Sequence, residues 1–90
     1  MPYISPDDRR QYESALNLII NRLSQRDFKP GDITYVLYSI LVRVARELEH
    51  EQGYAGMSRV RASVQDAADE FYRVEMAPYE DQKIRENGAV

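Results

Sequence analysis

Hydrophobic residues recur every three or four positions in three separate runs of this chain. At about 100° per residue, such spacing places each run on one side of an α-helix. The runs are Tyr12, Leu16, Ile19, Ile20 and Leu23; Ile33, Leu37, Ile40, Leu41, Val44 and Leu48; and Met57, Val60, Val64, Ala67, Ala68, Phe71 and Val74. Three amphipathic helices with short connections predict an all-α fold with antiparallel neighbours.

Local signals mark the ends of these helices. Ser5-Pro6-Asp7-Asp8 combines an N-cap hydroxyl, a proline suited to the first helical turn and two carboxylates, so a helix begins here and runs to about Arg26. Pro30-Gly31 ends it. The second helix then runs from Ile33 to about Gln52, with Gly53 as its C′ residue.

The third run is expected to break or kink at Ala77-Pro78, because proline lacks the amide hydrogen that a helix interior needs. A short helix over residues 79–86 follows, and Asn87-Gly88 ends it. The predicted architecture is an antiparallel bundle of three helices plus a short C-terminal helix after the proline break, in one domain of residues 1–90.

Composition limits both stability and chemistry. The chain has 90 residues, 43% of them hydrophobic and 30% charged, a net charge of −3 and no cysteine. A domain this small buries only about 60–65% of the surface of its unfolded chain, so association with a second copy would stabilise it. The absence of cysteine excludes disulfides, thiolate zinc sites and cysteine nucleophiles, and fits a reducing compartment.

The location expected from the sequence is the cytoplasm. The first eight residues lack the basic and apolar segments of a secretory signal. The most apolar stretch, residues 33–44, is interrupted by polar side chains and is far shorter than the ~20 residues needed to span a bilayer.

The second predicted helix is hydrophobic on two sides. Tyr35, Tyr38, Val42 and Ala45 lie roughly 90–180° from its main run. The main run accounts for packing within one chain, and tyrosine suits half-buried contact surfaces. We therefore predict a homodimer interface on this second side.

Aromatic residues gather near the predicted break. The candidate residues are Phe71, Tyr72, Pro78, Tyr79 and Ile84. They would dock the last helix onto the bundle in one interpretation, and display a partner-binding surface in the other.

Two acidic patterns have features of metal sites. Glu47-x-x-His50 has the spacing of di-metal carboxylate bundles, but His50 lies roughly 130° from its helix's main run. Asp66, Asp69 and Glu70 project away from the third run, so they do not form the inward Mg²⁺ site of a nucleotide hydrolase. We predict no catalytic, cofactor or metal site, and an ion pair between Asp69 and Arg73.

Basic residues are mostly arginines. Arg22, Arg26, Lys29, Arg43 and Arg46 would form a phosphate-binding patch if the first two helices pack antiparallel. The negative net charge and the lack of a recognition helix argue against nucleic-acid binding. Ion pairs with Asp27, Asp32 or Glu47 are expected instead.

Three segments resemble landmarks of an uncharacterised family of small all-helical prokaryotic and phage proteins. The C-terminal segment is Glu70-Phe71-Tyr72-Arg73, Ala77-Pro78-Tyr79-Glu80-Asp81, Lys83-Ile84 and Glu86-Asn87-Gly88; the others are Pro2-Tyr3-Ile4 and Gly31-Asp32-Ile33-Thr34-Tyr35-Val36. The resemblance implies no activity and no functional residue.

The sequence thus favours a small cytoplasmic accessory or interaction protein, a homodimer with a possible protein partner and no catalytic machinery. The alternatives are a Mg²⁺-dependent all-α nucleotide pyrophosphohydrolase-like enzyme and a nucleic-acid-associated regulator.

Overall fold

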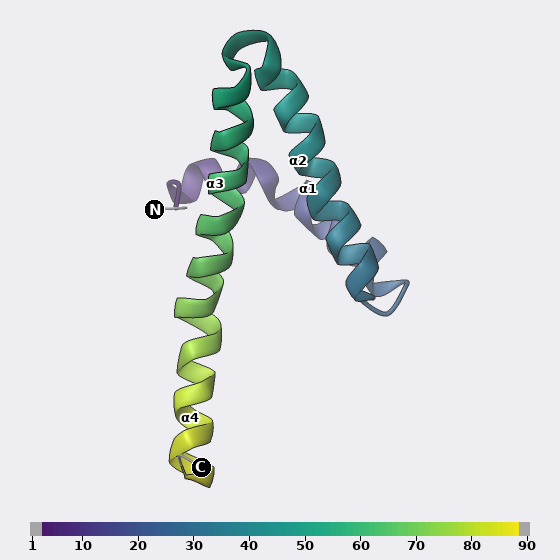
Figure 1. The fold of residues 1–90 in the computed structure, drawn as a ribbon. Coiled ribbons are helices and arrows are strands. Elements are labelled where there is room, and N and C mark those ends of the chain that lie inside the picture. Colours follow the sequence, from purple (N-terminus) through teal and green to yellow (C-terminus); the bar gives the residue numbers. More distant parts are fainter. Residues whose placement is uncertain (1–2, 89–90) are drawn as a thin grey trace.

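The protein has an all-α fold in a computed structural model that describes residues 3–88, with residues 49–52 described by their backbone alone. Its elements are α1 (Pro6–Ser24), α2 (Pro30–Gln52), α3 (Tyr54–Phe71), the π-helical turn η1 (Tyr72–Met76) and α4 (Ala77–Asn87). α2 and α3 form an antiparallel hairpin, and α1 crosses behind both (Figure 1). α3, η1 and α4 follow one another without a break along a single rod.

The predicted helix start at Ser5 and the glycines after α2 and α4 are confirmed, but neither Gly53 nor Gly88 has the left-handed α conformation of a regular C-terminal cap. The Ser5 hydroxyl accepts a hydrogen bond from the Asp8 amide at 3.2 Å, at the start of α1. Gly53 and Gly88 follow α2 and α4 with φ of 55° and 83°, a region that favours glycine. α2 begins at Pro30 and α3 at Tyr54, in each case three residues before the predicted start.

The turn between α1 and α2 holds two residues in the left-handed region. The Phe28 amide donates to the Leu23 carbonyl at 2.9 Å, a six-residue closure typical of a Schellman motif. Asp27 and Phe28 have φ of 60° and 52°. Aspartate tolerates this conformation better than most L-residues, whereas an aromatic residue rarely adopts it.

The predicted break at Ala77-Pro78 is wrong, because the helix continues through it. Pro78 occupies the first turn of α4, and the Ala77 amide donates to the Tyr72 carbonyl, five residues earlier. In a regular helix the proline ring would collide with the carbonyl four residues before it. The π turn is wider than an α turn, so it changes the spacing between the proline ring and the preceding carbonyl groups. The rod therefore continues through Ala77-Pro78.

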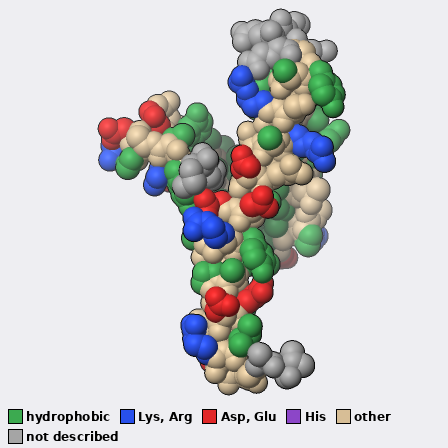
Figure 2. Space-filling view, turned by 60° about the vertical axis from the view of Figure 1, so that its left-hand side comes forward, with side chains coloured by type: hydrophobic (Ala, Val, Ile, Leu, Met, Phe, Trp, Pro, Cys, Tyr) green, Lys and Arg blue, Asp and Glu red, His purple; other side chains and the backbone are tan. Residues whose placement is uncertain are grey.

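One chain encloses no hydrophobic core within its described residues, where no hydrophobic side chain is buried. The accessible surface is 7,912 Å², against about 5,400 Å² for a compact monomer of this mass. The radius of gyration is 16.6 Å, against about 12 Å for a compact chain. Hydrophobic side chains lie on the surface over much of the molecule (Figure 2), so the closed bundle expected from the sequence is not formed within one chain.

The strained turn gives a stability prediction. Asp27→Gly should raise the free energy of unfolding by about 0.5–1 kcal/mol in urea titration, because glycine adopts a positive φ without steric cost. Asp27→Val is the matched control and should lower it, since a β-branched residue fits this region worst. Equal stability of the two variants would contradict the strain described here.

Candidate functional site

The largest contact between helices lies between α2 and α3, and it leaves apolar crevices on both of its sides. One crevice, of about 450 Å³, is lined on α2 by Ile40, Leu41, Val44 and Leu48 and on α3 mainly by Val60 and Val64. The other, of about 390 Å³, lies beside Val42, Ala45 and Met57. Both are open to solvent and almost without polar lining, which suits a protein surface as the occupant.

α1 lies beside another side of α2 with few close backbone contacts, and two further apolar crevices open between the two helices. Near the N-terminus, Tyr12, Leu16 and Ile19 of α1 approach Ile40 of α2. Ile40 also lines the α2–α3 crevice, so the two hollows meet at this residue. Apolar surface therefore extends continuously from α1 across α2 to α3.

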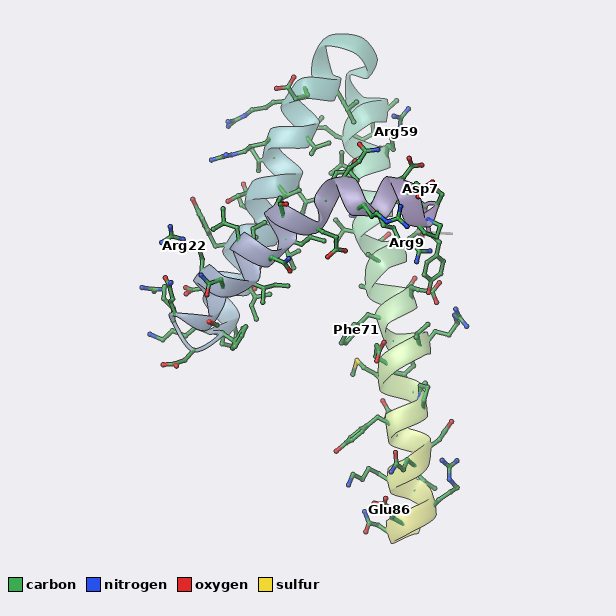
Figure 3. All side chains as sticks on the ribbon, turned by 180° about the vertical axis from the view of Figure 1, so that it is seen from behind. Asp7, Arg9, Arg22, Arg59, Phe71 and Glu86 are labelled. Carbon is green, nitrogen blue, oxygen red and sulfur yellow. The ribbon has the colours of Figure 1, made fainter. Side chains whose placement is uncertain are left out.

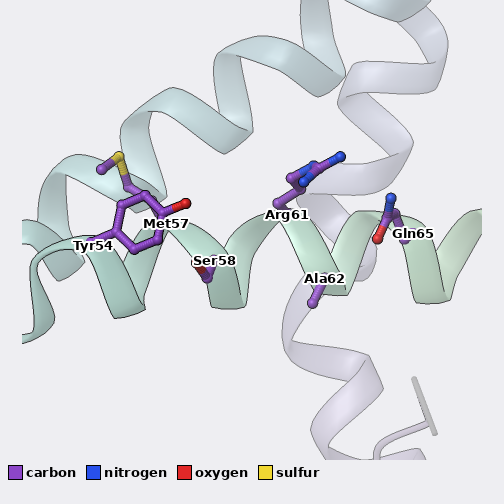
Figure 4. A pocket seen from close by; sticks show the side chains of 6 residues that line it. All are labelled: Tyr54, Met57, Ser58, Arg61, Ala62 and Gln65. Carbon is purple, nitrogen blue, oxygen red and sulfur yellow. The ribbon is translucent and has the colours of Figure 1, made fainter.

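A more polar hollow lies on α3 alone. Its lining side chains are Tyr54, Met57, Ser58, Arg61, Ala62 and Gln65 (Figure 4). All six belong to one helix, and among the described side chains no second element lines the hollow. This arrangement describes a helix surface better than a binding site.

The predicted interface residues on α2 divide into two pairs. Val42 and Ala45 are half-buried against α3, in the crevice that Met57 also lines. Tyr35 and Tyr38 are exposed, with Tyr35 beside the C-terminal half of α1. Whether a second chain covers them remains a prediction.

Sequence reasoning missed a second exposed set on α2. Leu37, Ile40 and Val44, which were expected to pack within the chain, are exposed. The signal was present in the sequence, because hydrophobic residues occupy most of the circumference of α2. Two neighbouring helices cannot cover so wide an apolar surface.

The predicted tail residues lie along the rod rather than against α1 or α2. Phe71 projects from the rod toward the side on which α2 lies (Figure 3). The Tyr72 hydroxyl lies 3.4 Å from a Glu80 carboxylate oxygen, and Lys83 Nζ lies 5.5 Å from the centre of the Tyr79 ring. Phe71, Tyr72, Tyr79 and Ile84 are all exposed. The docking interpretation thus finds no support within one chain.

Acidic residues form no metal-binding group of three or more among the described side chains. The predicted Asp69–Arg73 ion pair is wrong, since Arg73 bonds to Glu70 instead. Both spacings are one turn of helix, so the sequence did not discriminate between them. His50 of the Glu47-x-x-His50 pattern and Glu51 lie among the side chains outside the described residues.

Basic residues are divided between two regions of the surface. Arg22 and Arg26 line a crevice with Asp32 at the α1–α2 turn, while Arg43 and Arg46 lie at least eleven residues beyond Asp32 on α2. Eleven residues of helix span about 16 Å, so the five predicted bases do not form one patch. The expected pairing with Asp32 is confirmed, with Arg26 Nε 2.5 Å from its carboxylate.

The Arg26–Asp32 pair joins the end of α1 to the first turn of α2. The hydrogen bond from Arg26 lowers the pKa of Asp32 below its usual value, and the positive charges of Arg26 and Lys29 act in the same direction. The carboxylate also lies near the positive end of the α2 dipole.

Comparisons with known proteins give one match. A family model described as Domain of unknown function (DUF6899) matches residues 1–90. No curated protein and no solved structure matches the chain. Within the described residues, no helix is long and apolar enough to span a membrane.

The Arg26–Asp32 pair predicts a pH dependence. A lowered pKa in the folded state means that the pair stabilises the fold above the unfolded-state pKa, near 4, and that this contribution is lost as pH falls through the folded pKa. NMR titration of the Asp32 carboxyl carbon should therefore give a midpoint below the usual value. Arg26→Gln should raise that midpoint; an unchanged midpoint would show that Arg26 does not cause the shift.

Proposed function

This chain belongs to the DUF6899 family, whose function is unknown, and we propose that it acts as a homodimeric helical interaction protein. In this proposal the protein acts by binding, and two copies associate through their exposed apolar surfaces. It carries no catalytic machinery. By the resemblance of its C-terminal motif, we assign it to prokaryotes or their phages, and by the sequence expectation given above we assign it to the cytoplasm.

The observation that carries the proposal is the absence of a buried hydrophobic side chain among the described residues. The accessible surface exceeds that of a compact monomer by about 2,500 Å². Obligate homodimers bury about 2,000–5,000 Å² in total, so an excess of this size in each chain fits such an interface. The same surface exposed on a monomer would favour aggregation.

The exposed tyrosines of α2 give the proposal a specific contact. Tyr38 is 63% exposed and Tyr35 is 67% exposed. Tyrosine contributes large apolar area and a polar tip, which is why it is enriched at interfaces. Val42 and Ala45 already contact α3, so we assign them to the support of this surface.

The two groups with shifted pKa values, Arg26 and Asp32, have a structural explanation. Catalytic groups are often held at shifted pKa values inside clefts. Arg26 and Asp32 shift because they bond to each other at an exposed turn. A structural ion pair therefore accounts for both shifts.

Sedimentation equilibrium at micromolar concentration tests the association. We expect twice the chain mass of 10.5 kDa, and a melting temperature that rises with protein concentration. Tyr38→Glu should weaken the dimer by about 2 kcal/mol or more, because it would place a charge in the interface. Tyr38→Phe keeps the apolar area and should remain dimeric.

A wild-type chain that sediments as a folded monomer at these concentrations would contradict the proposal. If Tyr38→Glu and Tyr38→Phe had the same dimer dissociation constant, the contact through Tyr38 of α2 would be contradicted.

The non-catalytic part of the proposal has its own test. Purified protein should neither hydrolyse nucleoside triphosphates with Mg²⁺ or Mn²⁺ nor change its melting temperature with millimolar concentrations of these ions. A rise of several degrees, together with metal-dependent hydrolysis, would favour a nucleotide hydrolase instead.

A further inference from the structure

The end of the rod extends beyond the rest of the molecule. The rod runs from Tyr54 to Asn87, which at 1.5 Å per residue is about 51 Å, close to the longest molecular extent of 53 Å. α2 has 23 residues and spans only about 35 Å. The end of the rod, about 16 Å over residues 77–87, therefore extends past the length of α2. We call residues 72–87 the C-terminal arm; α2 and the rod diverge from the hairpin tip, so the arm lies away from α2 (Figure 1).

An arm of this kind needs a partner surface. Within the described residues the main contact of α4 is with the adjacent η1, so the arm is supported by the continuity of the rod. The arm carries exposed hydrophobic side chains, which include Tyr72, Val74, Met76, Tyr79 and Ile84. Covering them requires packing that one chain does not supply.

The π turn aligns the arm with the apolar side of α3. Tyr72 and Glu80 lie within 3.4 Å of each other, so residues eight apart face the same way across the turn. Phe71 and Tyr79 have the same separation and share a face. Phe71 also lies seven residues after Val64, which lines the crevice against α2. The stripe that faces α2 therefore continues onto the arm, where Phe71 is 59% exposed and Tyr79 is 61% exposed.

The side of α2 that lies against the rod near the hairpin tip is also apolar. Leu41 and Ala45 line the crevices against α3. Tyr38 precedes them by three and seven residues, so it lies on the same side of α2, nearer the α1–α2 turn. There the rod has diverged, and Tyr38 remains exposed. Tyr38 of α2 and Phe71 and Tyr79 of the rod are thus all exposed, on helices that diverge from the hairpin tip.

We propose that the C-terminal arm of a second copy fills this angle, with the two arms antiparallel and each lying between α2 and the rod of the other chain. This inference rests on the proposed homodimer and assigns its interface. In a two-fold dimer each chain gives and receives the same element, so one arrangement covers both arms and both α2 surfaces. Phe71 of each chain then lies beside Tyr79 of the other.

Features of the chain favour a second copy over a different protein. The arm and the surface that would receive it are both apolar, and both belong to every chain. The arm has four acidic residues (Glu75, Glu80, Asp81 and Glu86) and three basic ones (Arg73, Lys83 and Arg85), so two identical arms do not strongly repel each other. The excess surface of about 2,500 Å² per chain also matches what an obligate dimer buries.

Cysteine pairing tests the inference directly, because the natural chain has no cysteine. Full-length Phe71→Cys and Tyr79→Cys chains, one of them isotopically labelled, are mixed, allowed to exchange and oxidised. Antiparallel arms should give mainly disulfide dimers of mixed mass. Asp81→Cys, mixed with Phe71→Cys, is the control and should form at least tenfold less mixed dimer, because position 81 faces away from the stripe.

Each outcome decides the proposal. Dimers of single mass, 71 to 71 and 79 to 79, would show parallel arms and overturn it, as would equal yields with Asp81→Cys. If circular dichroism shows that either variant is unfolded, Glu75→Cys replaces both; it lies midway between positions 71 and 79 and should link to its own copy. A wild-type dimer without these links would overturn the arm pairing alone, whereas a wild-type monomer would overturn the homodimer as well.

Discussion

The packing of α2 against α3 is the contact on which the arrangement of this chain depends. Leu41 and Leu48 meet Val60 and Val64 there, and the contact sets the angle between the two helices. Apolar side chains of α1 and α2 that line a shared crevice, together with the Arg26–Asp32 pair, hold α1 beside another side of α2. The arm is held through the continuity of the rod. Displacing α2 from α3 would therefore remove the frame that positions both.

The helices were predictable because their signals are local. Period, the Ser5 cap and the glycines after α2 and α4 depend on neighbouring residues, and each occurs as expected. The passage through Pro78 was not predictable from proline rules, because the π turn that permits it depends on the hydrogen bonding of a whole segment. Proline rules predict a break at Ala77-Pro78. The π turn before it allows the helix to continue instead.

The candidate surface was predictable in composition but not in arrangement. Periodicity indicates that Leu37 and Tyr38 avoid water, but it does not say which chain covers them. Leu37 was assigned to the interior of the chain and is 54% exposed, whereas Val42, assigned to an interface, contacts α3. A helix that is apolar over most of its circumference offers several ways to pack, and only the placement of its neighbours selects one.

The π turn also fixes the length of the segment that contains it. A π turn holds one residue more than an α-helix that spans the same turns, and is therefore equivalent to an insertion within the helix. Loss of one residue between 72 and 76 would restore α geometry and leave Tyr79 seven residues after Phe71, a spacing that keeps both on one side of an α-helix. The extra residue is therefore absorbed within the turn, and the apolar sides of α3 and α4 stay aligned with it present. A second extra residue in α geometry would have no such turn to absorb it, and would rotate α4 by about 100° away from the side of Phe71.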